Sequence, residues 1–159
     1  MTLRKPLVLV SGQMQQIQAG DTLDATCNEV DAVSMENSNA GALPIGAPVY
    51  CDGAGTVDKA QADAAATVEV LGLVQAEIAI AGSGSVQTDG ILAATTGQWD
   101  VITGDAGGLT AGTVYYLDPD TAGMLTDTAP TGAGDYVVRV GKAISTTELE
   151  ISISQPIKL

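Results

Sequence analysis

Histidine is absent from the 159-residue chain, and its absence removes several classes of functional site. Without an imidazole there is no Ser–His or Cys–His catalytic pair and no histidine-liganded metal. The two cysteines, Cys27 and Cys51, have no CxxC spacing, so zinc and thiol-redox motifs do not apply either. The sequence therefore predicts a protein that is not an enzyme, with no catalytic, cofactor-binding or metal-binding residues.

Aromatic residues are also scarce, at 3% of the chain with no phenylalanine. We expect a thin, mainly aliphatic core whose few large side chains are Trp99 and the four tyrosines Tyr50, Tyr115, Tyr116 and Tyr136. A single tryptophan in such a chain more often anchors a core or a subunit interface than a ligand platform. The 19 glycines suit many tight turns and argue against long helices.

Basic residues are few: six Lys and Arg stand against 19 Asp and Glu, giving a net charge of −13. This balance disfavours nucleic acid and anionic membranes as partners. The apolar run at 7–10 is too short for a signal-peptide core or a membrane span. We therefore expect synthesis and use from the cytosol, with Cys27 and Cys51 as free, partly buried thiols.

The second half of the chain carries the clearest strand patterns. Apolar and polar residues alternate with a period of two over 148–154. A second strand is expected over 136–141, where Tyr136, Val138 and Val140 alternate with Val137, Arg139 and Gly141, and a third over 114–117. Residues 118–123, DPDTAG, form a turn signal, because proline presets φ and glycine permits positive φ. Short strands separated by turns predict an all-β fold, an antiparallel β-sandwich or barrel-like domain.

The first half contains a similar arrangement. Residues 43–52 align with 109–118, with Leu, Gly, Tyr and Asp matching at one offset, and 68–74 resemble 137–143. One interpretation is an internal duplication, with repeat units at 43–81 and 109–153. The other is that two β-hairpin units with the same turn requirements converge on one pattern.

The domain organisation follows from these patterns. Residues 1–23 are expected to form an N-terminal arm or hairpin, residues 24–42 a polar linker, and residues 43–159 the β domain. A strand over 29–35 is an alternative within the linker.

Other local signals complete the interpretation of the β domain. Residues 59–66, KAQADAAA, have the best helix propensity, but their shortness favours one turn of helix or a loop. A strand is expected over 77–81, followed by a turn at 82–84, and Asp89-Gly90 is a hairpin signal.

Two kinds of loop residue resemble binding motifs without meeting their requirements. The glycine-rich runs at 82–84 and 104–108 lack the lysine of a phosphate-binding loop. Asp105, Asp118 and Asp120 lack the spacing and terminal glutamate of a calcium-binding EF-hand. We interpret all of them as turn-forming residues.

With these residues in view, the sequence resembles small virion structural proteins of tailed bacteriophages. The resemblance rests on KPLVLVSGQMQQIQAGDTL near the N-terminus, QWDVITGDAGGLTAGTVYYLDPDTAGMLTDTAP, VVRVGKAIS, and the tail Pro156–Leu159. It covers both ends and most of the second half, and it is looser over 24–80. Similar modules occur in capsid decoration proteins, head fibres, and tail or baseplate fibres. The decoration-protein family has no catalytic residues to carry over.

The resemblance implies a capsid decoration, or cement, protein: small, β-rich, often trimeric, and bound to the outside of an expanded capsid. The expected partners are the major capsid protein and further copies of the chain in a homotrimer, with no nucleic acid and no membrane. The expected location is the capsid exterior of the virion, after synthesis in the host cytoplasm. A tail-fibre, collar or baseplate component is the alternative, and a glycan-binding β module is a third class.

The N-terminal arm is the candidate partner-binding segment. Arg4 and Lys5 form a positive pair on an acidic chain, and strand-like apolar sequence follows at Leu7, Val8, Leu9 and Val10. An accessible strand can add to the sheet edge of a neighbouring protein. The alternative is that this hairpin folds back as an edge of its own domain.

Overall fold

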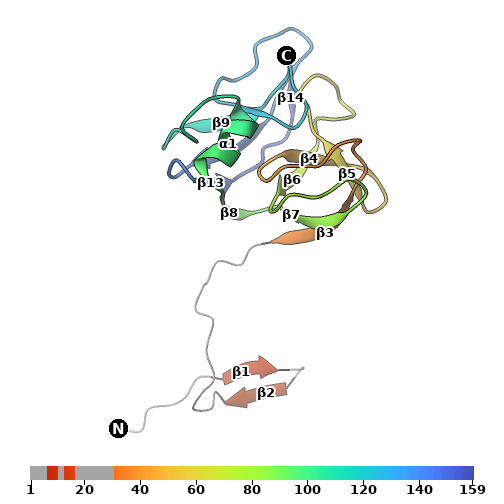
Figure 1. The fold of residues 1–159 in the computed structure, drawn as a ribbon, viewed down its shortest axis with the longest axis vertical. Helices are drawn as coiled ribbons and strands as arrows, with labels where there is room; N and C mark the ends of the chain where they lie inside the picture. Colours follow the sequence, from red (N-terminus) through yellow and green to blue (C-terminus); the bar gives the residue numbers. More distant parts are fainter. Residues whose placement is uncertain (1–6, 11–12, 17–30) are drawn as a thin grey trace.

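The computed structural model describes residues 31–159, and before them only the backbone of residues 7–10 and 13–16. Strand makes up 40% of the structure, with one short helix among the described residues. The prediction of an all-β, largely antiparallel fold is therefore confirmed (Figure 1).

The first half of the body is a closed five-stranded barrel in the order β3-β5-β4-β6-β7. Its strands are β3 (Ala32–Asn37), β4 (Pro48–Gly53), β5 (Thr56–Lys59), β6 (Val70–Val74) and β7 (Ser83–Gln87). Every pairing is antiparallel except the closing one, in which Glu36 lies opposite Thr56 on parallel β3 and β5.

The second half is an antiparallel five-stranded sheet in the order β10-β9-β12-β13-β8. Its strands are β8 (Gly90–Ala93), β9 (Val114–Leu117), β10 (Leu125–Thr126), β12 (Arg139–Ala143) and β13 (Glu148–Ile151). The remaining elements are helix α1 (Thr96–Thr103), the pair β11 (Tyr136–Val137) and β14 (Ile157–Lys158), and the hairpin β1 (Leu7–Val10) and β2 (Gln13–Gln16).

The two five-stranded units share one strand order and one register. Reading β5-β4-β6-β7-β3 beside β10-β9-β12-β13-β8 matches each strand with its counterpart in chain order. The matching cross-strand pairs are Val49–Gly72 with Tyr115–Gly141, Cys51–Val57 with Leu117–Leu125, Val74–Val86 with Ala143–Leu149, and Val33–Val86 with Leu92–Leu149. The register shift between β4 and β6 also recurs between β9 and β12. The two units therefore have the same architecture.

A glycine in the corresponding strands β6 and β12 explains part of this likeness. A Cβ on Gly72 would lie 2.3 Å from the carbonyl oxygen of Gln87, and a Cβ on Gly141 would lie 2.4 Å from that of Glu150. Neither contact is sterically possible, so each strand needs glycine where the next strand crosses closely.

The units differ in how their sheet ends. In the first unit β3 runs on to Asn37 and closes the barrel against β5. In the second, β8 stops at Ala93 and α1 follows, lying against β10. The second sheet therefore stays open, with a helix where the barrel has its closing pair (Figure 1).

One hydrophobic core runs through both units. Leu149 and Ile151 are buried on β13 whereas Glu150 between them is exposed, which confirms the predicted alternation. Trp99 is completely buried and its Nε1 donates to the Thr147 carbonyl oxygen at 3.0 Å, so its predicted anchoring role in the core is confirmed.

The helix lies where the sequence did not indicate one. Thr95 and Gln98 form a reciprocal capping box at the start of α1, and Gly104 ends it at φ +76°. The residues with the best helix propensity, 59–66, instead form the end of β5 and a series of turns. The capping box and the burial of Trp99 and Ile102 stabilise a helix at 96–103, whereas helix propensity alone does not stabilise one at 59–66.

Two further local predictions are wrong. Asp89-Gly90 does not join a hairpin, because β7 pairs with β3 and β6 whereas β8 pairs with β13. It is the crossover between the units. Residues 77–81 form no strand and contribute one isolated bridge, Ile78 to Leu43, while the expected turn at 82–84 already belongs partly to β7.

Strand β3 falls within residues 24–42, where the sequence indicated a linker with a strand over 29–35 as the alternative. It spans Ala32–Asn37 and pairs with both β5 and β7. Asn37, 2% exposed, fixes its end, since its Nδ2 donates to the carbonyl oxygens of Gly41, Ile78 and Ala79. Residues 32–37 are therefore one of the five strands of the barrel.

Candidate docking surfaces

The partner-binding residues expected in the N-terminal arm are described only in part. Leu7, Val8, Leu9 and Val10 form β1, whose backbone pairs antiparallel with β2 from Leu7–Gln16 to Val10–Gln13. Arg4, Lys5 and Cys27 lie outside the described residues. The arm's binding role thus stays a prediction.

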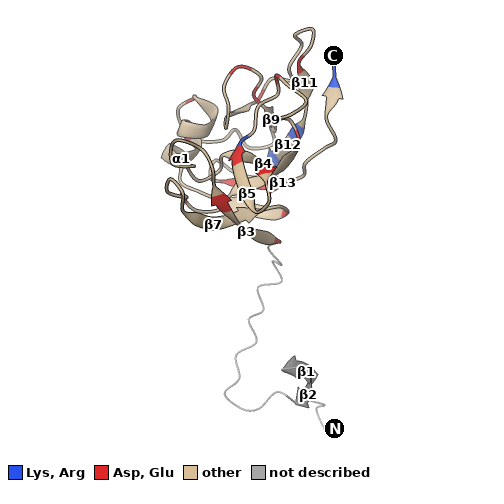
Figure 2. Ribbon diagram, turned by 90° about the vertical axis from the view of Figure 1, so that its right-hand side faces the viewer, with Lys and Arg blue, Asp and Glu red and all other residues tan. Residues whose placement is uncertain are grey.

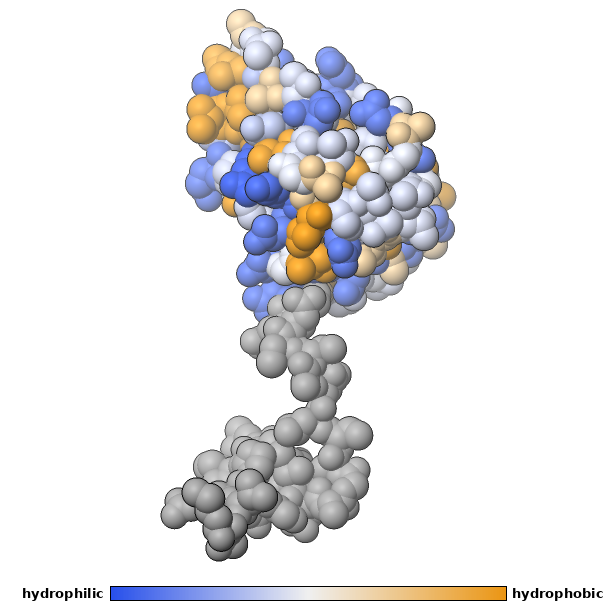
Figure 3. Space-filling view, turned by 90° about the vertical axis from the view of Figure 1, so that its left-hand side faces the viewer, coloured by the Kyte–Doolittle hydropathy of each residue, from blue (hydrophilic) through white to orange (hydrophobic). Residues whose placement is uncertain are grey.

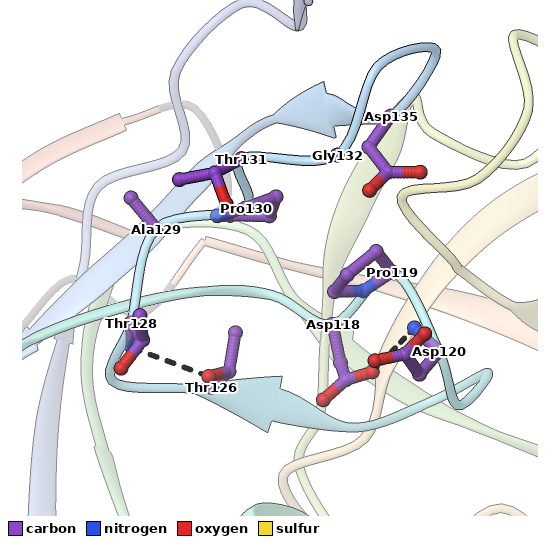
Figure 4. A pocket seen from close by; sticks show the side chains of 10 residues that line it. All are labelled: Asp118, Pro119, Asp120, Thr126, Thr128, Ala129, Pro130, Thr131, Gly132 and Asp135. Atoms are coloured by element: carbon purple, nitrogen blue, oxygen red, sulfur yellow. Dashed lines mark hydrogen bonds between the residues drawn. The ribbon is translucent and has the colours of Figure 1, made fainter.

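A polar hollow lies between the β9–β10 turn and the loop that precedes β11 (Figure 4). It has a volume of about 310 Å³, and its carboxylates are Asp118, Asp120 and Asp135. Asp118 Oδ1 accepts from the backbone N–H groups of Asp120 and Thr121 at 2.7 and 2.8 Å. Asp118 therefore shapes its own turn, as predicted from DPDTAG.

Within residues 31–159 and the two arm strands, no group of three or more His, Cys, Asp or Glu side chains is placed to hold a metal ion. The helix found in the same residues is too short to cross a membrane.

The tip of the β4–β5 hairpin is exposed and carries two perturbed groups. Ser38 Oγ donates to Asp52 Oδ2 at 2.6 Å, and this bond, with a second from Thr56, lowers the pKa of Asp52. Burial raises the pKa of Tyr50, and the nearby carboxylates Asp58 and Asp52 add to that rise. The pKa shift of Asp52 thus depends on Ser38, which follows β3, as well as on Thr56 of the hairpin.

Cys51 lies on this hairpin as well and is exposed, with no disulfide to a described residue. The expectation that it is partly buried, as a counterpart of Leu117, is therefore wrong. Leu117 is fully buried, whereas residues 51–53 are exposed where β4 extends beyond its pairing with β6, which ends at Tyr50.

On the side of the molecule shown in Figure 3, apolar side chains form separate patches. One patch, which we call the α1 ledge, borders a hollow of about 250 Å³. Its residues are Pro44, Ile45, Glu77, Gly97, Gln98 and Val101. Val101 is 60% exposed, whereas Trp99 and Ile102 of the same helix are buried.

A second patch, which we call the Gly112 hollow, lies on the outer face of the open sheet, with a volume of about 420 Å³. It is lined by Ile91, Gly112, Lys142, Ala143, Ile144 and Glu150. The register places Glu150 on β13 opposite Ile91 on β8 and opposite Lys142 on β12. The hollow therefore contains one basic and one acidic side chain among mainly aliphatic ones.

Sequence reasoning did not single out either surface. Exposed Ile91 and Ile144 look like ordinary strand residues, and their exposure depends on which sheet face is covered. One signal was present: the alignment of 43–52 with 109–118 matches Gly46 to Gly112.

Neither a family model nor a curated protein matches the chain.

Proposed function

We propose that the protein is a non-enzymatic structural component of a tailed-phage particle that decorates and stabilises the outer capsid surface. The observation that carries the proposal is the sequence resemblance to small phage virion proteins. Its longest block, residues 98–130, contains most of α1 and all of β9 and β10, and supplies Trp99 to the shared core.

The charge of the body is compatible with a protein partner rather than nucleic acid. Residues 31–159 hold 16 acidic and four basic residues, a net charge of −12. The carboxylates are spread over the body, and the basic residues are Lys59, Arg139, Lys142 and Lys158 (Figure 2). A surface of this sign repels phosphate backbones and anionic lipid headgroups.

The proposed mechanism is additive binding. Each copy binds across a seam between major capsid protein subunits on the particle exterior, after synthesis in the host cytoplasm. Because it binds the assembled shell and not separated subunits, its binding free energy opposes their separation. Homotrimers would place several such contacts on the shell at once.

The N-terminal arm is the proposed anchor to the capsid. Arg4 and Lys5 precede the first acidic residue, Asp21, so the arm begins with the opposite charge from the body. A two-stranded hairpin is marginal alone, and β1 pairs with β2 alone among the described strands. Addition of β1 to a sheet edge of the capsid protein would satisfy its outer backbone groups.

A tail-fibre, collar or baseplate component is the second candidate, because an N-terminal attachment segment suits such a protein equally well. Copy number in purified virions separates the two. The decoration function predicts hundreds of copies per particle, measured on a stained gel against the major capsid protein band. A count in single or low double digits overturns it and favours the tail component.

A further inference from the structure

The two units contain the same glycine turn in two different environments. Gly46 and Gly112 both have φ of +84°, and both N–H groups donate at 2.8 Å to the carbonyl oxygens of equivalent residues, Val74 and Ala143. A Cβ on Gly46 would lie 2.9 Å from Trp99 Cζ3 and 3.3 Å from Ile102 Cγ1. A Cβ on Gly112 would meet nothing within 4 Å. The first turn is thus covered by α1, and the second is uncovered.

The sheet face beside each turn repeats this difference. Leu73 and Gln87, adjacent on β6 and β7, are 0% and 1% exposed, although Val74 and Val86 beside them occupy the opposite face of these strands. Their counterparts are Lys142 and Glu150, which line the Gly112 hollow and are exposed. The first unit's outer face is covered inside the chain, whereas the second unit's equivalent face is open.

The α1 ledge is suited to cover such a face. Val101 projects from the helix whose other side already covers the Gly46 turn, and Pro44 and Ile45 extend the apolar area. Its acidic residue is Glu77, while the Gly112 hollow holds Lys142, one of four basic residues in 31–159, together with Glu150. Both surfaces are largely apolar, and each carries a charge that the other can pair: Glu77 on the ledge, and Lys142 in the hollow, where it lies opposite Glu150. The ledge combines α1 with two loops of the first unit, whereas the hollow lies on the second sheet.

We propose that the α1 ledge of one copy docks into the Gly112 hollow of a second copy, with Val101 against Ile91 and Ile144 and with Glu77 facing Lys142. Two dissimilar complementary surfaces give a head-to-tail contact, and repetition of such a contact closes a ring when the rotation permits. The inference deepens the homo-oligomer part of the proposed function. It concerns contacts between copies of the chain alone.

The first test is sedimentation of the full-length chain at micromolar concentration. Ile144→Asp and Val101→Asp each place a charge in the contact, and each is expected to abolish assembly. Ile80→Asp is the matched control, because Ile80 is 62% exposed and lies outside both surfaces. Assembly by the Ile144→Asp variant, or loss of assembly in the Ile80→Asp control with the fold intact by circular dichroism, overturns the proposal.

Charge reversal tests the pairing. Lys142→Glu and Glu77→Lys are each expected to raise the dissociation constant by about tenfold or more, and the double variant should restore it. If the contact instead paired two Gly112 hollows, Glu150→Lys would rescue Lys142→Glu and Glu77→Lys would not, and that result overturns the proposal.

Mixing gives the sharpest outcome. The Ile144→Asp variant retains an intact ledge and the Val101→Asp variant an intact hollow, so together they should form a one-to-one dimer and nothing larger. Two monomers in the mixture, or a monomeric wild-type chain, overturn the contact. The capsid proposal is judged separately by virion copy number, so the two fail independently.

Discussion

At the scale of single residues, one glycine in each unit, Gly72 or Gly141, permits the closest approach of two neighbouring strands. In Gly141→Ala the new methyl group would meet the Glu150 carbonyl oxygen, so the strands must separate. We expect a loss of about 2–3 kcal/mol in the free energy of unfolding, measured by chemical denaturation. The matched control is Gly97→Ala in α1, where nothing lies within 4 Å and alanine favours the helix. Equal losses in both variants would contradict this account.

A second residue-scale prediction concerns acid. The hydrogen bonds from Ser38 and Thr56 hold the pKa of Asp52 below its ordinary 3.8. A carboxyl with a depressed folded-state pKa stabilises the fold above its unfolded pKa, and this contribution is lost as the pH falls through the folded value. Because Asp52 is exposed, Asp52→Asn should cost at most about 1 kcal/mol at neutral pH.

The measurement is the free energy of unfolding of wild type and Asp52→Asn at neutral pH and through the acid range. The difference between the two should shrink as the pH falls below about 4. A difference that stays constant, or grows in acid, would show that the carboxylate bonds do not contribute as described.

At the scale of elements, the capping box decides where α1 begins. Thr95 Oγ1 accepts from Gln98 N at 3.3 Å, and Gln98 Oε1 accepts from Thr95 N at 2.8 Å. Thr95→Ala should lower stability by about 1 kcal/mol, with Thr95→Ser near wild type because it keeps the hydroxyl. Urea denaturation followed by Trp99 fluorescence measures both, and a serine variant as weak as the alanine variant would rule out capping as the cause.

The elements also show how far the sequence predicts this structure. Strands β6, β9 and β13 follow directly from apolar runs and alternation, and the 118–123 turn follows from its Asp-Pro and Gly. The helix was missed, although Thr95 and Gln98 have the spacing of a capping box, because its eight residues are short and also depend on contacts of Trp99 distant in sequence. Asp89-Gly90 specifies a turn but not which strands it joins.

The candidate surfaces were less predictable than the fold. Exposure of Ile91 and Ile144 depends on the second sheet's outer face being uncovered, and no local pattern encodes that. The partner-binding residues predicted from the sequence, Arg4, Lys5 and Leu7 to Val10, are identified by the charge and hydropathy of neighbouring positions along the chain. The α1 ledge instead joins residues from two connections and a helix.

At the scale of the whole molecule, backbone hydrogen bonds join the two units in addition to the covalent link between β7 and β8. Ala62 N donates to the Asp118 carbonyl oxygen and Tyr136 N donates to that of Ala62, at 3.0 and 2.8 Å. With a continuous core, we expect one cooperative unfolding transition. Gly72→Ala and Gly141→Ala, one in each unit, should shift that same transition by circular dichroism and by Trp99 fluorescence. Two separate transitions would show that the units unfold independently.

The arm supplies the last whole-molecule prediction. Deletion of residues 2–23 should leave the body folded, because the barrel begins at β3, and should abolish binding to decoration-free particles. Arg4→Glu with Lys5→Glu in the full chain is the milder variant, expected to weaken binding in a salt-dependent manner. A truncated protein that binds with unchanged affinity refutes the arm's role, and one that unfolds indicates that the hairpin belongs to its own domain.

The hydrogen bonds that hold Leu159 against the loop before β11 have a consequence for protein engineering. Leu159 donates its N–H to the Asp135 carbonyl oxygen, and its own carbonyl oxygen accepts from Gly134, so the C-terminus lies beside the exposed loop tip at 131–134 (Figure 1). A peptide inserted at that tip and a tag fused to Leu159 would therefore emerge at one place. A fluorescent donor and acceptor fused at these two points should show efficient energy transfer. The two halves of a split reporter protein fused there should reassemble on a single copy of the chain.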